Sequence, residues 1–69
     1  MKINETLKDA LLLKYQGDIA TAKANIQVYL NNPVGIGEHP DLISAIDTEM
    51  EKAAEADDKL TFLNDQLDW

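Results

Sequence analysis

The chain has 69 residues, of which 45% are hydrophobic, and its six lysines and thirteen acidic residues give a formal net charge of −7. This length leaves room for one small domain over residues 1–69, and the lack of cysteine excludes disulfides, thiolate zinc sites and cysteine nucleophiles. The negative charge argues against direct binding to nucleic acid or to anionic membrane surfaces.

The first predicted element is a helix over residues 4–31. Its apolar residues recur at steps of three or four, which places them on one helical face. The predicted face comprises Ile3, Leu7, Leu11, Tyr15, Ile19, Ala22, Ile26 and Tyr29, widened by Leu12, Val28 and Leu30. Asn4 is a candidate N-cap, and the run Asn31-Asn32-Pro33 is a strong stop signal because proline cannot continue the helix.

Gly17 raises an alternative to one continuous helix. An interior glycine costs about 1 kcal/mol relative to alanine, so Gly17-Asp18 is also able to end one helix and begin the next. The stretch from Gly17 to Ala22 partly matches a tetratricopeptide repeat, although the chain holds no second copy and the tyrosine position is Ile19. Because the apolar periodicity passes through Gly17 without a phase change, we favour the continuous helix.

A loop over residues 32–39 leads to a second predicted helix over residues 40–67. Pro40 suits the first helical position, and Asp41 then places a negative charge in the first turn. The predicted apolar face of this helix comprises Leu42, Ile46, Met50, Ala53, Ala56, Leu60, Leu63 and Leu67. Two helices of equal length joined by a short loop favour an all-α fold, an antiparallel two-helix hairpin.

A lone hairpin has a single seam, and a chain this short needs further stabilisation. We therefore expect two hairpins to assemble, in the manner of a coiled coil, into a four-helix bundle, with a homodimer favoured. The apolar residues beside the two predicted faces form the candidate self-association surface: Leu12, Leu13, Val28, Ile43, Phe62 and Trp69. The alternative is that these are ordinary scattered surface residues.

The loop and the acidic second half hold the candidate partner-binding residues. These are Ile36, Glu38, His39, Asp47, Glu51, Glu55 and Asp58. The purely structural interpretation is that the loop is a turn and that the acidic residues form a solvated helix face. The functional interpretation is that the acidic residues form a docking surface for a basic partner or a mimic of nucleic acid. With one histidine and no cysteine, no cofactor or metal is expected, and an enzyme or metal site at Glu38 and His39 ranks last.

The segment Tyr29-Leu30-Asn31-Asn32-Pro33-Val34-Gly35-Ile36-Gly37-Glu38-His39-Pro40-Asp41, with the preceding Lys-Tyr-Gln-Gly-Asp-Ile-Ala stretch, carries a resemblance. It resembles short proteins of large contractile-tailed phages, notably the myoviruses of marine cyanobacteria, a group without an assigned activity. The resemblance implies the host cytoplasm as the setting and an accessory or structural role, and it carries over no functional residue.

These observations lead to one expected function and one alternative. We expect a non-enzymatic helical protein that acts by self-association and protein–protein contact, without a signal peptide or membrane span and therefore cytoplasmic. The alternative is an acidic inhibitor or mimic that binds a host protein which handles nucleic acid.

Overall fold

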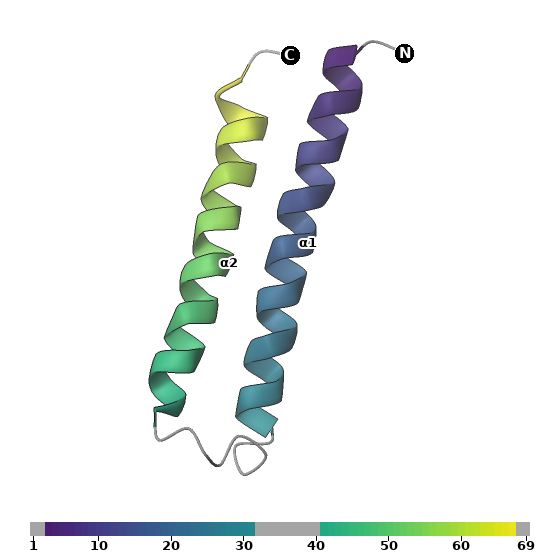
Figure 1. Ribbon diagram of the computed structural model, residues 1–69. Helices are drawn as coiled ribbons and strands as arrows, with labels where there is room; N and C mark the ends of the chain where they lie inside the picture. Colours follow the sequence, from purple (N-terminus) through teal and green to yellow (C-terminus); the bar gives the residue numbers. More distant parts are fainter. Residues whose placement is uncertain (1–2, 32–40, 68–69) are drawn as a thin grey trace.

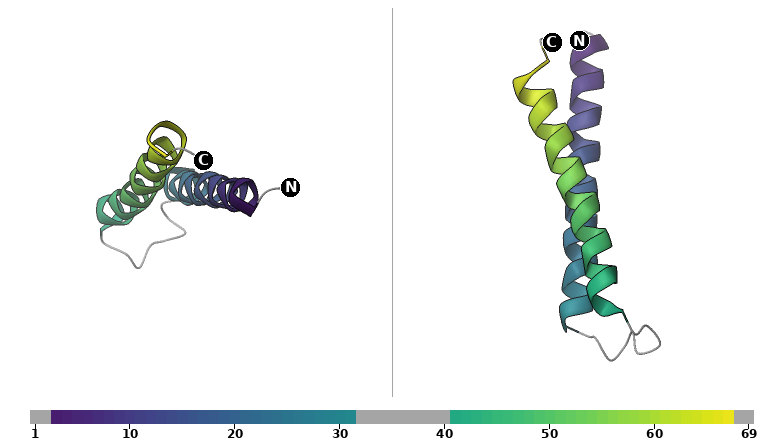
Figure 2. Two further views of the ribbon diagram at one scale, coloured as in Figure 1. Left: turned by 90° about the horizontal axis from the view of Figure 1, so that it is seen from above. Right: turned by 90° about the vertical axis from the view of Figure 1, so that its left-hand side faces the viewer.

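The computed structural model describes residues 3–31 and 41–67. They form two helices, α1 (Ile3–Asn31) and α2 (Leu42–Asp65), which run antiparallel so that the start of α1 and the end of α2 lie at the same end of the molecule (Figure 1). The two helices pack against each other along their length (Figure 2). The predicted all-α hairpin is therefore confirmed.

α1 passes through Gly17 without a break, so the three-helix alternative is wrong. No atom lies within 4 Å of the position that a Cβ would occupy at Gly17, and the residue is exposed. The helix therefore tolerates this glycine at its ordinary cost of about 1 kcal/mol, because the packing on either side of it continues uninterrupted. Asn4, expected as the N-cap, lies inside the first turn of α1.

α2 begins two residues later than expected and ends two residues earlier, at Asp65. Asp41 is its N-cap, not a first-turn residue: its backbone is non-helical, and its Oδ1 accepts a hydrogen bond of 2.8 Å from the backbone N–H of Ser44. This bond satisfies one of the amides that a helix start leaves unpaired. At the other end, the backbone N–H of Gln66 donates to the Phe62 carbonyl.

The seam between the helices follows a seven-residue repeat. Most of the buried and half-buried positions form two rows on each helix: Leu12, Ile19 and Ile26 beside Tyr15, Ala22 and Tyr29 on α1, and Ile46, Ala53 and Leu60 beside Leu42, Glu49, Ala56 and Leu63 on α2. Leu11, Asn25 and Ala45 are half-buried beside these rows. Steps of four and three alternate strictly in these rows, which is the spacing of a left-handed coiled coil.

This strict alternation corrects several predicted seam positions. From Ile46 the next seam residue is three positions on, at Glu49, whereas Met50 is 56% exposed. Continued backwards along α1, the repeat reaches Lys8, which is half-buried, while Leu7 and Ile3 are exposed. A general three-or-four rule admits both series of positions, and only the seven-residue repeat separates them.

The hairpin has a small core. Within the described residues, the buried apolar side chains are Ala22, Ala56 and Leu63, and the one buried charged side chain is Glu49. Nine large apolar side chains are exposed: Ile3, Leu7, Leu13, Val28, Leu30, Ile43, Met50, Phe62 and Leu67. Two helices bury one stripe each, so a single seam leaves the flanks of both helices in solvent.

Candidate functional site

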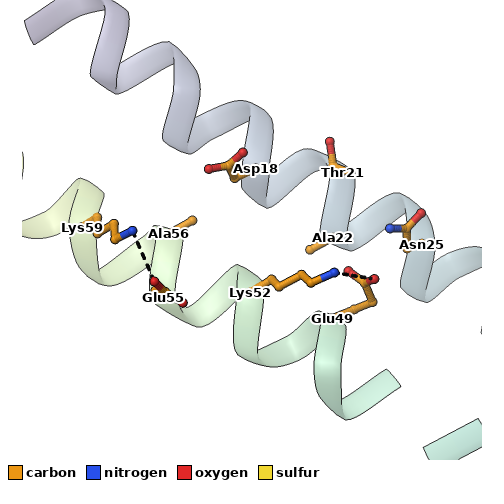
Figure 3. Close-up of a pocket in the computed structure, with 9 residues that line it drawn as sticks. All are labelled: Asp18, Thr21, Ala22, Asn25, Glu49, Lys52, Glu55, Ala56 and Lys59. Atoms are coloured by element: carbon orange, nitrogen blue, oxygen red, sulfur yellow. Dashed lines mark hydrogen bonds and ion pairs between the residues drawn. The ribbon is translucent and has the colours of Figure 1, made fainter. Parts of the chain in front are cut away.

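A polar groove of about 320 Å³ crosses the middle of the hairpin (Figure 3). Its lining residues come from both helices: Asp18, Thr21, Ala22, Asn25, Glu49, Lys52, Glu55, Ala56 and Lys59. The groove exists because Ala22 and Ala56 meet in the seam, where two methyl groups leave space that larger side chains would fill. The broad face that holds this groove is called the pocket face below.

Glu49 occupies a seam position where the repeat calls for an apolar residue. Its residue exposure is 7%, and its Oε1 lies 3.5 Å from Nζ of Lys52, whose side chain is 63% exposed. A buried carboxylate needs a counter-charge, because desolvation penalises an isolated ion by several kcal/mol. Lys52 supplies that charge from the edge of the groove.

Lys59 and Lys14 add two further ion pairs on this face. Lys59 Nζ lies 3.2 Å from Oε1 of Glu55 and 5.9 Å from the ring centre of Tyr15, which links α2 to α1. Lys14 Nζ lies 2.9 Å from Oδ2 of Asp18, and the hydrogen bond to this carboxylate raises the pKa of Lys14 above its ordinary value of 10.5. Because these pairs are exposed to solvent, they contribute little to stability.

A second, apolar pocket of about 180 Å³ lies nearer the end of the hairpin where α1 begins. Its lining residues are Leu11, Tyr15, Lys59, Phe62, Leu63 and Leu67. Because Tyr15 and Leu63 belong to the same seam rows as Ala22 and Ala56, this pocket also opens on the pocket face. The pocket face is thus polar in its middle and apolar near one end.

The structure describes no constellation that holds a metal. Over residues 3–31 and 41–67, no group of three or more His, Asp or Glu side chains is placed to bind a metal ion. Three of the candidate partner-binding residues, Ile36, Glu38 and His39, lie outside the described residues. The described side chains place charges and apolar surface, which are the elements of a binding surface.

The other four candidate partner-binding residues lie together. Asp47, Glu51, Glu55 and Asp58 follow one another at steps of four, four and three along α2, and all four are exposed. This spacing keeps them on the side of α2 away from its seam rows, with Glu55 at the edge of the polar groove and paired with Lys59. The structure therefore describes an acidic strip on the outer side of α2.

The five described candidate self-association residues do not all lie on one surface. Leu12 is half-buried in the seam, whereas Leu13 follows it by about 100° around α1 and is 66% exposed. Phe62 lines the apolar pocket, while Val28 and Ile43 are exposed elsewhere. Trp69 lies outside the described residues.

A broad apolar surface opposite the pocket face was missed by the sequence analysis. The seam residues that line the two pockets belong to one row on each helix, the row of Ala22 on α1 and the row of Ala56 on α2. The other seam row of each helix, which contains Ile19 on α1 and Ala53 on α2, therefore lies toward the opposite face. Next to those rows stand Leu30 on α1 and the seven-residue series Ile43, Met50 and Asp57 on α2. Strict seven-residue spacing is the signal that would have found this surface.

Comparison with known proteins gives no relative: no family model, no curated protein and no solved structure matches the chain. In the described part of the chain, neither helix combines the length and the apolar character required to cross a membrane.

Proposed function

We propose that this protein is a non-enzymatic helical protein that works by self-association and by contact with other proteins. One observation carries the proposal: the described hairpin buries three apolar side chains and leaves nine large ones exposed. Burying a side chain such as leucine or isoleucine contributes about 1.5–3 kcal/mol, so association of hairpins offers much more apolar burial than the seam alone. A homodimer is the simplest assembly that does this.

The phage resemblance completes the proposal with a setting. It supports a role as an accessory or structural protein in the host cytoplasm during infection. In that role, a small helical hairpin contributes a contact surface to a larger assembly, and no substrate turnover is involved.

The test is a mass measurement in solution. Size-exclusion chromatography with light scattering at micromolar concentration is expected to give a mass of at least twice 7.7 kDa, with the helical circular-dichroism signal intact. A fully helical particle of 7.7 kDa over the whole concentration range would overturn the self-association proposal.

The acidic strip favours a second candidate, an inhibitor or mimic that occupies a host protein which handles nucleic acid. Four exposed carboxylates on one helix face present a row of negative charge to a basic partner. Its test is capture from host extract with the native chain and with a variant in which Asp47, Glu51, Glu55 and Asp58 become amides. A basic nucleic-acid-binding partner held only by the native chain, and released by salt or by added DNA, is the expected result. Equal capture by both chains would contradict mimicry.

A further inference from the structure

The two broad faces of the hairpin differ in chemistry around residues 19–30 of α1 and 43–53 of α2. On the pocket face this region shows Thr21, Asn25, Glu49 and Lys52. On the opposite face the same region is mainly aliphatic, with Lys23 and Asp47 beside the apolar side chains. We call this second surface the aliphatic face and define it by Leu12, Ile19, Ile26, Leu30, Ile43, Ile46, Met50 and Ala53.

Much of the aliphatic face is in contact with solvent. Ile43 is 82% exposed, Leu30 58% and Met50 56%, and the other five members are half-buried at the edge of the seam. These residues come from both helices, so they form a two-helix surface in place of a single stripe. Such a surface is what each half of a four-helix bundle presents to the other half.

The charges on this side of the hairpin identify what covers it. Alongside the aliphatic face, between residues 12 and 30 of α1 and 42 and 61 of α2, we find three charged residues: Lys23, Asp57 of opposite sign, and Asp47, which lies in the same seven-residue row as Thr61. Ala22 and Ala56 line the same groove and therefore lie at similar levels along the hairpin. Lys23 and Asp57 directly follow them in the sequence, so these two residues also lie at similar levels. Within the described residues, neither Lys23 nor Asp57 forms an ion pair.

We propose that a second copy of this chain covers the aliphatic face, with its loop at the same end, so that α1 of each copy packs on α2 of the other. This arrangement brings the two aliphatic regions together and sets Lys23 of each copy opposite Asp57 of the other. The arrangement with loops at opposite ends would instead set the aliphatic region against Gln16, Thr61 and Asn64. Because α2 of each copy packs on α1 of the other, the two α2 helices lie diagonally across the bundle, which keeps their acidic strips apart.

The size of the face matches this occupant. The hairpin measures 49 × 20 × 14 Å, so one broad face covers about 1,000 Å². A stable protein interface takes about 800 Å² from each partner. A lasting dimer therefore needs contacts over most of the broad face, of which the aliphatic face is one part.

This inference rests on the proposed self-association and adds the surface and the orientation. The first experiment compares Met50→Glu, on the aliphatic face, with Val28→Glu, by sedimentation equilibrium and circular dichroism. Val28 is equally exposed, at 56%, and follows Thr21 of the pocket face by seven residues. We expect Met50→Glu to weaken dimerisation at least about 100-fold while helicity is retained at high concentration, and Val28→Glu to change it less than about threefold.

A second experiment tests the orientation without removing apolar surface. Lys23→Glu and Asp57→Lys are each expected to weaken the dimer, and the double variant is expected to restore it, because the exchanged charges face each other again. If Met50→Glu fails to fold, the charge-exchange variants still test the proposed interface.

The outcomes separate the two proposals. A native chain that is monomeric throughout overturns both. A native dimer that Met50→Glu leaves intact, or that Val28→Glu dissociates instead, overturns the aliphatic face as the interface and leaves self-association standing. If the double charge variant dimerises as weakly as the two single variants, the same-end arrangement is overturned.

Discussion

Glu49 and Lys52 form an ion pair with one member inside the helix seam and the other at its edge, Oε1 to Nζ at 3.5 Å. This pair stands beside Ala22 and Ala56, so the middle of the hairpin is both thin and polar. The middle of the seam therefore adds little apolar burial to the hairpin.

Replacement of Glu49 by leucine is expected to stabilise the hairpin by about 1–3 kcal/mol, because a buried ion pair is often weaker than well-packed apolar side chains. The groove beside Ala22 gives the new side chain room. Urea unfolding of Glu49→Leu measures the effect, and Glu51→Leu, at an exposed position on the same helix, is the control. A lower unfolding midpoint for Glu49→Leu would show that the carboxylate stabilises the seam.

Gly17→Ala is expected to raise the free energy of unfolding by about 1 kcal/mol, since alanine restores helix propensity and reduces the freedom of the unfolded chain. The new Cβ meets no atom within 4 Å. Thermal unfolding measures the change. The matched control is Ala20→Gly, at an exposed position one turn further along α1, which is expected to lose a similar amount. A loss of stability in Gly17→Ala would reveal a close contact at this position.

Asp41→Ala is expected to cost about 1 kcal/mol, because it removes the side-chain acceptor of the Ser44 N–H at the start of α2. Asp41→Asn keeps an acceptor oxygen and is expected to retain most of the stability. Urea unfolding of both variants makes the comparison. Equal losses in the two variants would mean that the charge of Asp41, and not the cap, stabilises the helix.

The Lys14–Asp18 pair predicts a pH dependence in the alkaline range. Asp18 raises the pKa of Lys14 above 10.5, so the pair's small contribution is fully present below pH 10.5 and disappears as the pH rises through the higher folded value. An NMR titration of the Lys14 side chain should show its pKa fall toward the ordinary value in Asp18→Asn. An unchanged pKa in that variant would contradict the contact.

The sequence predicted the helices well because helix formation depends on local, periodic features. The apolar spacing through Gly17 and the turn residues around Pro33 were sufficient to predict a hairpin. The seam was harder, because Glu49 and Met50 both satisfy a three-or-four step, and their burial depends on the supercoil that the two helices adopt together.

Of the candidate surfaces, the sequence alone predicts the one that lies on a single helix and misses the one that combines both helices. The acidic strip of Asp47, Glu51, Glu55 and Asp58 follows from spacing along one helix, so the sequence was enough to place these residues on one face. The aliphatic face combines residues of both helices, and which flanks meet on one side depends on how α1 and α2 are rotated against each other. That rotation is a tertiary property.

The central claim is that one hairpin buries too little apolar surface to be stable without a partner. Its most direct test is the thermal unfolding midpoint of the native chain measured over a hundredfold range of protein concentration. Because binding between folded copies stabilises them by mass action, the midpoint is expected to rise steadily with concentration. A midpoint that stays constant over the whole range, with a complete helical signal before the transition, would contradict the claim.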